Sequence, residues 1–227
     1  TAIDLAVDEF LKRELRALLP AAGWLSEETA DAPHRLGGDL VWLVDPIDGT
    51  RAFIHGRDGW AVSVALVNTS RPLLGLLYAP ARARDEGGEF WHGEAGKGGW
   101  RHGKRLVAST RRELPGARVP AWKLHEEDAD LVAVTQPNSI ALRMAMVAAG
   151  EADLVASLRW GYEWDIAAAG LIAREAGAAV TDAFGHPLNY NKRDPKAFGV
   201  LVCAPAIHAA AVEPLATRAE ALAQPEA

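Results

Sequence analysis

The stretch Trp42-Leu43-Val44-Asp45-Pro46-Ile47-Asp48-Gly49-Thr50 is the most informative part of this 227-residue chain. It begins within an apolar run, Leu40 to Val44, that predicts a strand, and we expect the chain to turn directly after that run. Asp45 and Asp48 are three positions apart across a proline, so both carboxylates and the Ile47 carbonyl can face one cation. Ligation by oxygen atoms alone suits Mg²⁺ or Mn²⁺ rather than zinc. The stretch therefore predicts a site for a hard divalent metal ion.

The two residues that end this stretch, Gly49 and Thr50, predict an anion site beside the metal. Glycine lets a ligand approach the backbone closely, and Thr50 opens the next segment with a hydroxyl and free N–H groups. An ordinary turn after a strand uses similar residue types. The full nine-residue string is much more specific than such a turn, and we interpret it as a metal site next to a phosphate site.

Two distant segments supply acids that can join the same metal site. Leu25-Ser26-Glu27-Glu28 lies upstream, and one of its acids can share the cation with Asp45. Alone, this segment would indicate only a solvated helix start. Downstream, Trp164 to Gly170 leads into a small-residue helix that we expect to end at Gly177, with Asp165 at its N-cap. A capping aspartate still has one oxygen available for a metal ion.

With these segments in this order and spacing, the chain resembles the inositol monophosphatase superfamily, the lithium-sensitive, magnesium-dependent phosphomonoesterases. The first family motif matches Trp42 to Phe53, the second matches Trp164 to Gly177, and the acidic pair matches Glu27-Glu28. The resemblance extends along nearly the whole chain. It implies a hydrolase that cleaves a small phosphorylated metabolite with the help of two or three Mg²⁺ ions, for which Mn²⁺ can substitute.

The resemblance also assigns metal ligands by position. One Mg²⁺ would be bound by Glu27, Asp45 and the Ile47 carbonyl, and a second by Asp45, Asp48 and Asp165. Paired ions about 4 Å apart can neutralise the ester oxygens, generate hydroxide near pH 7 and stabilise the leaving alkoxide. No covalent phosphoenzyme is required by this chemistry.

Catalytic and phosphate-binding roles follow from the same resemblance. Thr1-Ala2-Ile3-Asp4 is similar to the family segment whose aspartate pairs with the motif threonine to orient the attacking water, which assigns that role to Asp4 and Thr50. Glu28 would be a supporting catalytic acid that holds a third ion or its waters. Gly49 and Thr50 would donate backbone N–H groups to the phosphate, and Asp165 would lie against the substrate.

Residues around the metal site depart from the inositol-specific pattern. Inositol phosphatases typically carry an acidic residue seven positions before the second-motif aspartate, where this chain has Leu158, and Thr-Asn-Phe where it has Arg51-Ala52-Phe53. The sequence Leu-Ser-Glu-Glu, the basic residue after Thr50, Leu142-Arg143 and the Gly185 to Asn191 segment look more like the 3′(2′),5′-bisphosphate nucleotidases of sulfur assimilation. We therefore favour hydrolysis of adenosine 3′,5′-bisphosphate to AMP and phosphate.

Under this nucleotidase hypothesis, Tyr190 would stack on adenine, while Lys192 or Arg193 would hold the 5′-phosphate. A surface loop after a turn explains the same three residues equally well. Other activities also stay open, namely inositol-1-phosphate phosphatase, histidinol-phosphate phosphatase, and a regulatory or binding protein that retains the fold. The intact set of acids argues against the last of these.

Bulk properties limit the partners and the compartment. The net charge of −6 argues against a nucleic-acid-binding surface. The single Cys203 excludes an intramolecular disulfide and fits a cytoplasmic enzyme. No apolar run reaches membrane-spanning length and no secretory signal is visible, so we expect no membrane partner. Family members often form homodimers, which implies a homodimer here, and usually carry a helical segment before the Asp4 motif, so we expect the natural chain to extend before Thr1.

Hydrophobic patterning predicts an α/β chain in two halves. Residues 1–130 form an α+β half with antiparallel strands, the acidic pair and the first metal motif, and residues 131–227 form an α/β half with the second metal motif. The resemblance implies that the halves stack as a layered αβαβα sandwich with the metals at their junction. The predicted helices are Asp4–Leu19, Ser139–Ala149, Ile166–Ala176 and one that begins at Pro205. The predicted strands are Leu40–Val44, Ala61–Val67, Leu73–Tyr78, Glu89–His92, Asp153–Leu158, Ala178–Asp182 and Val200–Cys203.

Overall fold

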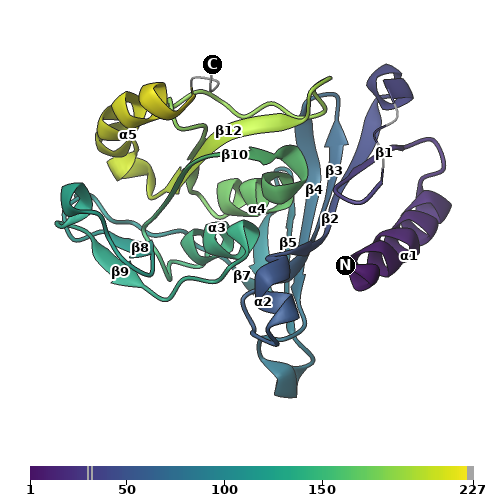
Figure 1. The fold of residues 1–227 in the computed structure, drawn as a ribbon, viewed down its shortest axis with the longest axis horizontal. Helices are drawn as coiled ribbons and strands as arrows, with labels where there is room; N and C mark the ends of the chain where they lie inside the picture. Colours follow the sequence, from purple (N-terminus) through teal and green to yellow (C-terminus); the bar gives the residue numbers. More distant parts are fainter. Residues whose placement is uncertain (30, 32, 224–227) are drawn as a thin grey trace.

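A seven-stranded sheet is the largest element of the computed structural model, which describes residues 1–29, 31 and 33–223 (Figure 1). Its strands follow chain order from edge to edge. The first pair is parallel and the others are antiparallel. The predicted strands of the first half are confirmed, and three short strands at the two edges are added. In order, the strands are β1 (Gly23–Ser26), β2 (Leu40–Asp48), β3 (Ala61–Asn68), β4 (Arg71–Ala79), β5 (Glu89–Glu94), β6 (Gly98–Arg101) and β7 (Lys104–Arg105).

Strand β2 does not end where the sequence predicted a turn. It continues past Val44 to Asp48, and its register against β3 shifts between Asp45 and Asp48. Pro46 has no N–H to donate to a neighbouring strand, so a local break in the hydrogen-bonded ladder accommodates it. The predicted turn after Val44 is therefore wrong, and the two aspartates lie on either side of an irregularity within a strand.

Helices and a second sheet complete the layers (Figure 1). Helix α1 (Ala2–Leu18) covers one face of the large sheet, and α3 (Ile140–Ala148) and α4 (Glu163–Glu175) cover the other. Behind them lies an antiparallel sheet in the order β10 (Leu154–Tyr162), β12 (Lys196–Cys203) and β11 (Ala179–Thr181), followed by α5 (His208–Ala223). This order of layers is the αβαβα sandwich that the resemblance implied, so the α/β fold class is confirmed.

Strand β12 shows how one segment serves two layers. Side chains alternate between the two faces of a strand. Val200 and Val202 accordingly join the central core between the sheets, while Leu201 and Cys203 pack with residues of α5. The thiol of Cys203 is buried, and burial raises its pKa to about 12. Cys203 is therefore a core residue, as its apolar sequence context predicted.

Helix α4 lies between the two sheets and is built from small residues because its neighbours come very close. A Cβ atom added to Gly75 of β4 would lie 2.6 Å from the carbonyl oxygen of Ala168. One added to Gly99 of β6 would lie 2.8 Å from that of Ile172. Because these glycines have no side chain, the backbone of α4 packs directly against the backbone of the strands. This contact fixes the position of the N-terminus of α4, which carries Asp165.

Smaller elements complete the structure. The predicted helix from Pro205 is divided into η4 (Pro205–Ile207) and α5. Strands β8 (Arg118–Pro120) and β9 (Val132–Val134) flank the predicted boundary between the halves and pair in parallel, and the division at residue 130 stays a prediction. No helix in the described ranges is both long and apolar enough to cross a membrane. The remaining elements are α2 (Thr50–Ile54), η1 (Pro33–Gly37), η2 (Arg84–Glu86) and η3 (Glu126–Asp128).

Candidate active site

Four of the predicted metal-binding acids come from three elements that meet at the junction of sheet and helices. Asp45 and Asp48 flank the irregularity in β2 and are buried, with 3% and 8% of their surfaces exposed. Glu27 directly follows β1, and its N–H donates to the Val44 carbonyl at 3.2 Å, which places it beside Asp45. Asp165 enters from the first turn of α4. The parallel pairing of β1 with β2 therefore explains how the upstream acid reaches the motif.

The electrostatics of these acids show that they share one space. Burial raises the pKa of Asp45 well above its usual range, and the charges of Asp48, Glu27 and Asp165 raise it further. Burial, followed by the charge of Asp48, raises the pKa of Asp165 to about 7. Carboxylates that oppose one another's ionisation in this way are stabilised by a cation between them. The donor set, made of oxygen atoms alone, fits Mg²⁺ or Mn²⁺.

The four acids lie near one another, but their side chains are not arranged as a complete set of metal ligands. Across the described ranges, no three Asp, Glu, His or Cys side chains form a group already close enough to hold an ion. Glu27 is also exposed, unlike the two aspartates of β2. Metal binding at this place would therefore draw the side chains inward, and the assignment of Glu27, Asp45, Asp48, Asp165 and the Ile47 carbonyl as ligands stays a prediction.

Asp48 is held in place by the start of helix α3. Its Oδ2 accepts hydrogen bonds from the Ser139 hydroxyl at 2.5 Å and from the Ala141 N–H at 2.7 Å. The Ile140 N–H donates to its other oxygen at 3.3 Å. Burial raises the pKa of Asp48, while these hydrogen bonds act in the opposite direction. One carboxylate thus ties the strand of the first half to a helix of the second.

Asp165 lies at the third position of α4 and not at its N-cap, which corrects the prediction. The N-cap is Tyr162, whose extended backbone passes from β10 directly into the helix. The Tyr162 N–H donates to Asp165 Oδ2 at 2.9 Å, as in a capping box. The helix therefore begins earlier than its run of small residues indicated. Asp165 still has its second oxygen for a ligand.

Gly49 and Thr50 form the sharp junction between β2 and α2. Gly49 has φ +93°, and an added Cβ atom would lie 2.9 Å from the Ser139 nitrogen, so glycine is required here for both conformation and space. Thr50 is the first residue of α2, where backbone N–H groups have no partner within the helix. Its hydroxyl donates to the Ile47 carbonyl at 3.1 Å, and the Ile47 N–H donates to Asp45 Oδ1 at 2.9 Å.

The predicted catalytic acids lie beside this cluster. Asp4 is 1% exposed in the first turn of α1, and its carboxylate accepts a hydrogen bond from the Thr1 hydroxyl. Burial raises the pKa of Glu27, and the charge of Asp4 contributes to the same shift, so Asp4 lies near the metal-binding acids. In the described structure no hydrogen bond joins Asp4 to Thr50. Glu28 is half-buried next to Glu27. The roles of Asp4, Thr50 and Glu28 stay predictions.

The predicted role of Tyr190 is wrong. The residue is only 2% exposed and belongs to the central core, so neither face of its ring is open to adenine. In the loop that follows, the ammonium group of Lys192 already has protein partners. Its Nζ lies 3.3 Å from the buried Glu163 carboxylate and donates to the Lys196 carbonyl at 2.6 Å. Arg193 is exposed. Tyr190, Lys192 and Arg193 are also absent from the lining of two cavities, of about 840 Å³ and 380 Å³, on the described part of the protein.

A cleft of about 840 Å³ has Asp48 and Asp165 in its wall. Leu158 lines it at the position where inositol phosphatases carry an acid. Arg159 and the 58% exposed Trp160 also line it, and sequence reasoning missed both. Their only signal was their place between Leu158 and Asp165, at the end of a predicted strand. Arg143, which the sequence did single out, also lines the cleft.

Comparisons with known proteins show the family to which this chain is similar. A sequence model described as the inositol monophosphatase family matches residues 1–220. Inositol monophosphatase 3 of Solanum lycopersicum is 30% identical over 210 residues, covering 85% of this chain and 76% of the relative. The 3′(2′),5′-bisphosphate nucleotidase CysQ of Escherichia coli K12 is 32% identical over 210 residues, covering 86% and 80%. The structure of a Thermotoga maritima IMPase superposes with TM-score 0.80 at 28% identity, covering 98% of this chain and 85% of that one.

Proposed function

This chain belongs to the inositol monophosphatase family, whose members are phosphatases, and from that premise we propose that it hydrolyses adenosine 3′,5′-bisphosphate to AMP and phosphate. Family members are generally metal-dependent, and we propose Mg²⁺ as the ion. The observation that carries the proposal is a group of acids whose charges raise the pKa of the buried Asp45, two of which, Asp48 and Asp165, line a cleft of about 840 Å³. Such a group of negative charges attracts cations, and bound cations in turn attract a negatively charged phosphate.

The metal site would use the acids that the structure brings together. Glu27, Asp45, Asp48, Asp165 and the Ile47 carbonyl would hold two or three Mg²⁺ ions, with Mn²⁺ as a substitute. When bound, these ions supply positive charge to the phosphate and lower the pKa of water. Asp48 would keep a fixed orientation because the Ser139 hydroxyl and the Ala141 N–H already hold its Oδ2.

Other residues of the chain would place the phosphate and the water. The N–H groups of Gly49 and Thr50 would donate to phosphoryl oxygens, at the point where the backbone turns into α2. The Thr50 hydroxyl would exchange its hydrogen bond to the Ile47 carbonyl for one to the attacking water, and Asp4 would orient that pair. Glu28, half-buried beside Glu27, would support this arrangement with a further negative charge.

Residues in the cleft support a nucleotide over a polyol. The side chain of Leu158 has no polar atom to bind sugar hydroxyls, while Arg143 and Arg159 bring positive charge to the same cleft. Two exposed aromatic residues, Trp122 and Trp160, also line the cleft, and a base can stack on an aromatic ring. Inositol 1-phosphate is the second candidate, because the tomato inositol monophosphatase is almost as similar as the nucleotidase.

The test is phosphate release from adenosine 3′,5′-bisphosphate and from inositol 1-phosphate, both with Mg²⁺ and on one preparation. We expect kcat/KM to be at least about tenfold higher for the nucleotide, a difference of roughly 1.4 kcal/mol in transition-state binding. The Asp45→Asn variant should lose turnover of both substrates while its circular dichroism spectrum stays native. A preference for inositol 1-phosphate would contradict the nucleotidase assignment, and an active Asp45→Asn enzyme would contradict the metal site.

A further inference from the structure

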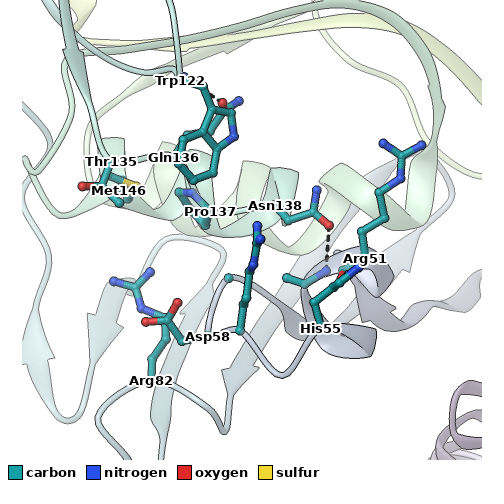
Figure 2. Close-up of a pocket in the computed structure, with 13 residues that line it drawn as sticks. Arg51, His55, Asp58, Arg82, Trp122, Thr135, Gln136, Pro137, Asn138 and Met146 are labelled. Atoms are coloured by element: carbon teal, nitrogen blue, oxygen red, sulfur yellow. Dashed lines mark hydrogen bonds between the residues drawn. The ribbon is translucent and has the colours of Figure 1, made fainter.

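A second cavity, of about 380 Å³, lies beside the cleft and is unusually basic for this chain (Figure 2). The whole chain carries a net charge of −6. The lining of this cavity nevertheless contains Arg51, Arg57, Arg82 and His55, with Asp58 as its only carboxylate among the described residues. A cavity of this charge within an acidic protein attracts anions.

Two of these guanidinium groups are free to bind a ligand. Arg82 lies 3.3 Å from the Glu89 carboxylate and is largely neutralised by it. For Arg51 and Arg57, by contrast, the described part of the chain provides no carboxylate partner. A guanidinium group presents several N–H donors in a plane that matches phosphate oxygens, and such charge-assisted pairs are stronger than neutral hydrogen bonds. The cavity thus has the donors of a phosphate site.

The cavity shares a wall with the proposed active site. Arg51 directly follows Thr50, and the Ala52 N–H donates to Asn138 Oδ1 at 3.2 Å, which fixes α2 against the segment before α3. A Cβ atom on Gly49 would contact the Ser139 nitrogen and, at 3.0 Å, the Gly59 carbonyl oxygen. Gly59 and Asn138 both line the cavity. A ligand with its reacting phosphate at Gly49 and Thr50 would therefore have its nearest neighbouring space here.

Trp122 links the two cavities. It lines both, together with Gln136 and Asn138, and 77% of its surface is exposed. Figure 2 shows its indole at the opposite side of the cavity from Asp58 and Arg82. Its backbone is held because the Trp122 N–H donates to Gln136 Oε1 at 3.1 Å, while no ring contact occupies the indole among the described residues. Such a ring is a ready surface for a nucleobase.

We propose that this cavity is the subsite for the second phosphate of a nucleoside bisphosphate, with Arg51 and Arg57 binding that phosphate and Trp122 stacking on the base. This inference rests on the proposed function and names the residues that would distinguish a bisphosphate from a monophosphate. Arg57 and Trp122 take the roles that the sequence had assigned to Lys192 or Arg193 and to Tyr190. The subsite therefore explains how a metal core common to the family can select this substrate.

The test measures one ratio, kcat/KM for adenosine 3′,5′-bisphosphate divided by kcat/KM for adenosine 3′-monophosphate. Loss of one charge-assisted contact to the second phosphate should lower this ratio about tenfold in Arg51→Gln and in Arg57→Gln, mainly through KM for the bisphosphate. Arg112→Gln, at an exposed arginine outside both cavities, is the matched control and should keep the wild-type ratio. A wild-type ratio in both cavity variants would overturn the proposal.

Trp122 has its own readout. Trp122→Ala should raise KM about tenfold for both adenine nucleotides relative to glycerol 2-phosphate, which has no ring to stack. An equal change for all three substrates would contradict stacking and indicate a general effect on the site. These comparisons separate the phosphate contact from the base contact within one assay.

A binding experiment distinguishes failure of the subsite from failure of the proposed function. If the wild-type enzyme does not turn over the bisphosphate, the nucleotidase function fails, and the subsite is then tested by calorimetric titration of both nucleotides into Asp45→Asn. Tighter binding of the bisphosphate, with the gain lost in Asp45→Asn/Arg57→Gln, would support the subsite. Equal binding of the two nucleotides would overturn it.

Discussion

Asp153 shows how much one buried charge can depend on its partners. The residue is 2% exposed, and its carboxylate accepts hydrogen bonds from the Arg118 guanidinium at 2.8 and 3.0 Å, from the Arg118 N–H at 2.9 Å and from the Ser109 hydroxyl. Burial alone would raise the pKa of Asp153. The hydrogen bonds outweigh it and hold the pKa well below its usual range. Asp153 therefore stabilises the native state in its charged form.

We predict that Asp153→Asn lowers the free energy of unfolding by about 2 kcal/mol at pH 7, less than for a fully buried pair because the Arg118 side chain is 40% exposed. Because the folded pKa is depressed, the stabilisation is present above the unfolded pKa of about 3.9 and is lost as pH falls below it. Urea unfolding should thus show a smaller difference between variant and wild type at pH 3 than at pH 7. Exposed Glu113→Gln is the control, and a difference independent of pH would refute the charge effect.

The sequence predicted some single residues well and others poorly, for physical reasons. Asp45 and Asp48 are three residues apart in one short string, so their closeness depends mainly on the local conformation around Pro46. Tyr190 is different, because its burial depends on Gly170 of α4, whose added Cβ atom would lie 3.1 Å from the tyrosine hydroxyl. Packing between distant segments decides such a case, and a loop sequence carries no sign of it. The position of Trp122 beside a cavity could not be predicted either, because the residues that line this cavity come from distant segments of the chain.

At the scale of elements, Ser139 is the N-cap of helix α3 and also binds Asp48. The Ser139 hydroxyl accepts a hydrogen bond from the Leu142 N–H at 2.9 Å, as an N-cap does, and donates to Asp48. A single side chain thus links the start of a helix to a proposed metal ligand. Loss of this hydroxyl should affect both stability and metal binding.

We predict that Ser139→Ala lowers the free energy of unfolding by about 1 kcal/mol, the usual cost of losing an N-cap. It should also raise the Mg²⁺ concentration needed for half-maximal activity several-fold, because Asp48 loses a donor that orients it. Ser139→Thr, which keeps the hydroxyl, should restore most of both properties. Urea unfolding and Mg²⁺ titration of activity check the two effects, and a normal Mg²⁺ requirement in Ser139→Ala would exclude the positioning role.

Predictions at this scale succeeded where periodicity was strong and failed where hydrogen bonding decided the boundary. The amphipathic pattern of α1 and the apolar runs of the long strands predicted those elements to within a few residues. Strand β2 passed its predicted end because the ladder with β3 resumes at Asp48 after Pro46. Helix α4 began early because Asp165 caps it from the third position. The short strands β8 and β9 were not predicted, because they form by pairing with each other across an intervening segment.

At the scale of the whole molecule, Gly75 and Gly99 of the large sheet lie against the backbone of α4 and set the distance between these two layers. Gly75→Ala would place a Cβ atom 2.6 Å from the Ala168 carbonyl oxygen, so strand or helix must move. We predict a loss of about 2 kcal/mol in the free energy of unfolding, as for other overpacked cores. Activity should fall too, because Asp165 lies one turn before Ala168 and moves with it.

Thermal unfolding and kcat/KM measure the two effects of Gly75→Ala. Gly37→Ala is the matched control, since nothing lies within 4 Å of its added Cβ atom, and both its stability and its activity should stay close to wild type. A Gly75→Ala protein as stable as the control would show that the layers are not held at a fixed spacing. The layer order itself was predictable only through the family resemblance, because no local pattern states which sheet face a helix will cover.

The large sheet ends at β7, a strand of only two residues, Lys104 and Arg105, both exposed. The free N–H and C=O groups of an edge strand are where a second chain can attach and start a fibril. Here the edge offers very few such groups, and two identical molecules meeting at it would bring like charges together. Intermolecular β-structure therefore has little to grow from on this side, which should help the protein to stay dispersed at high concentration.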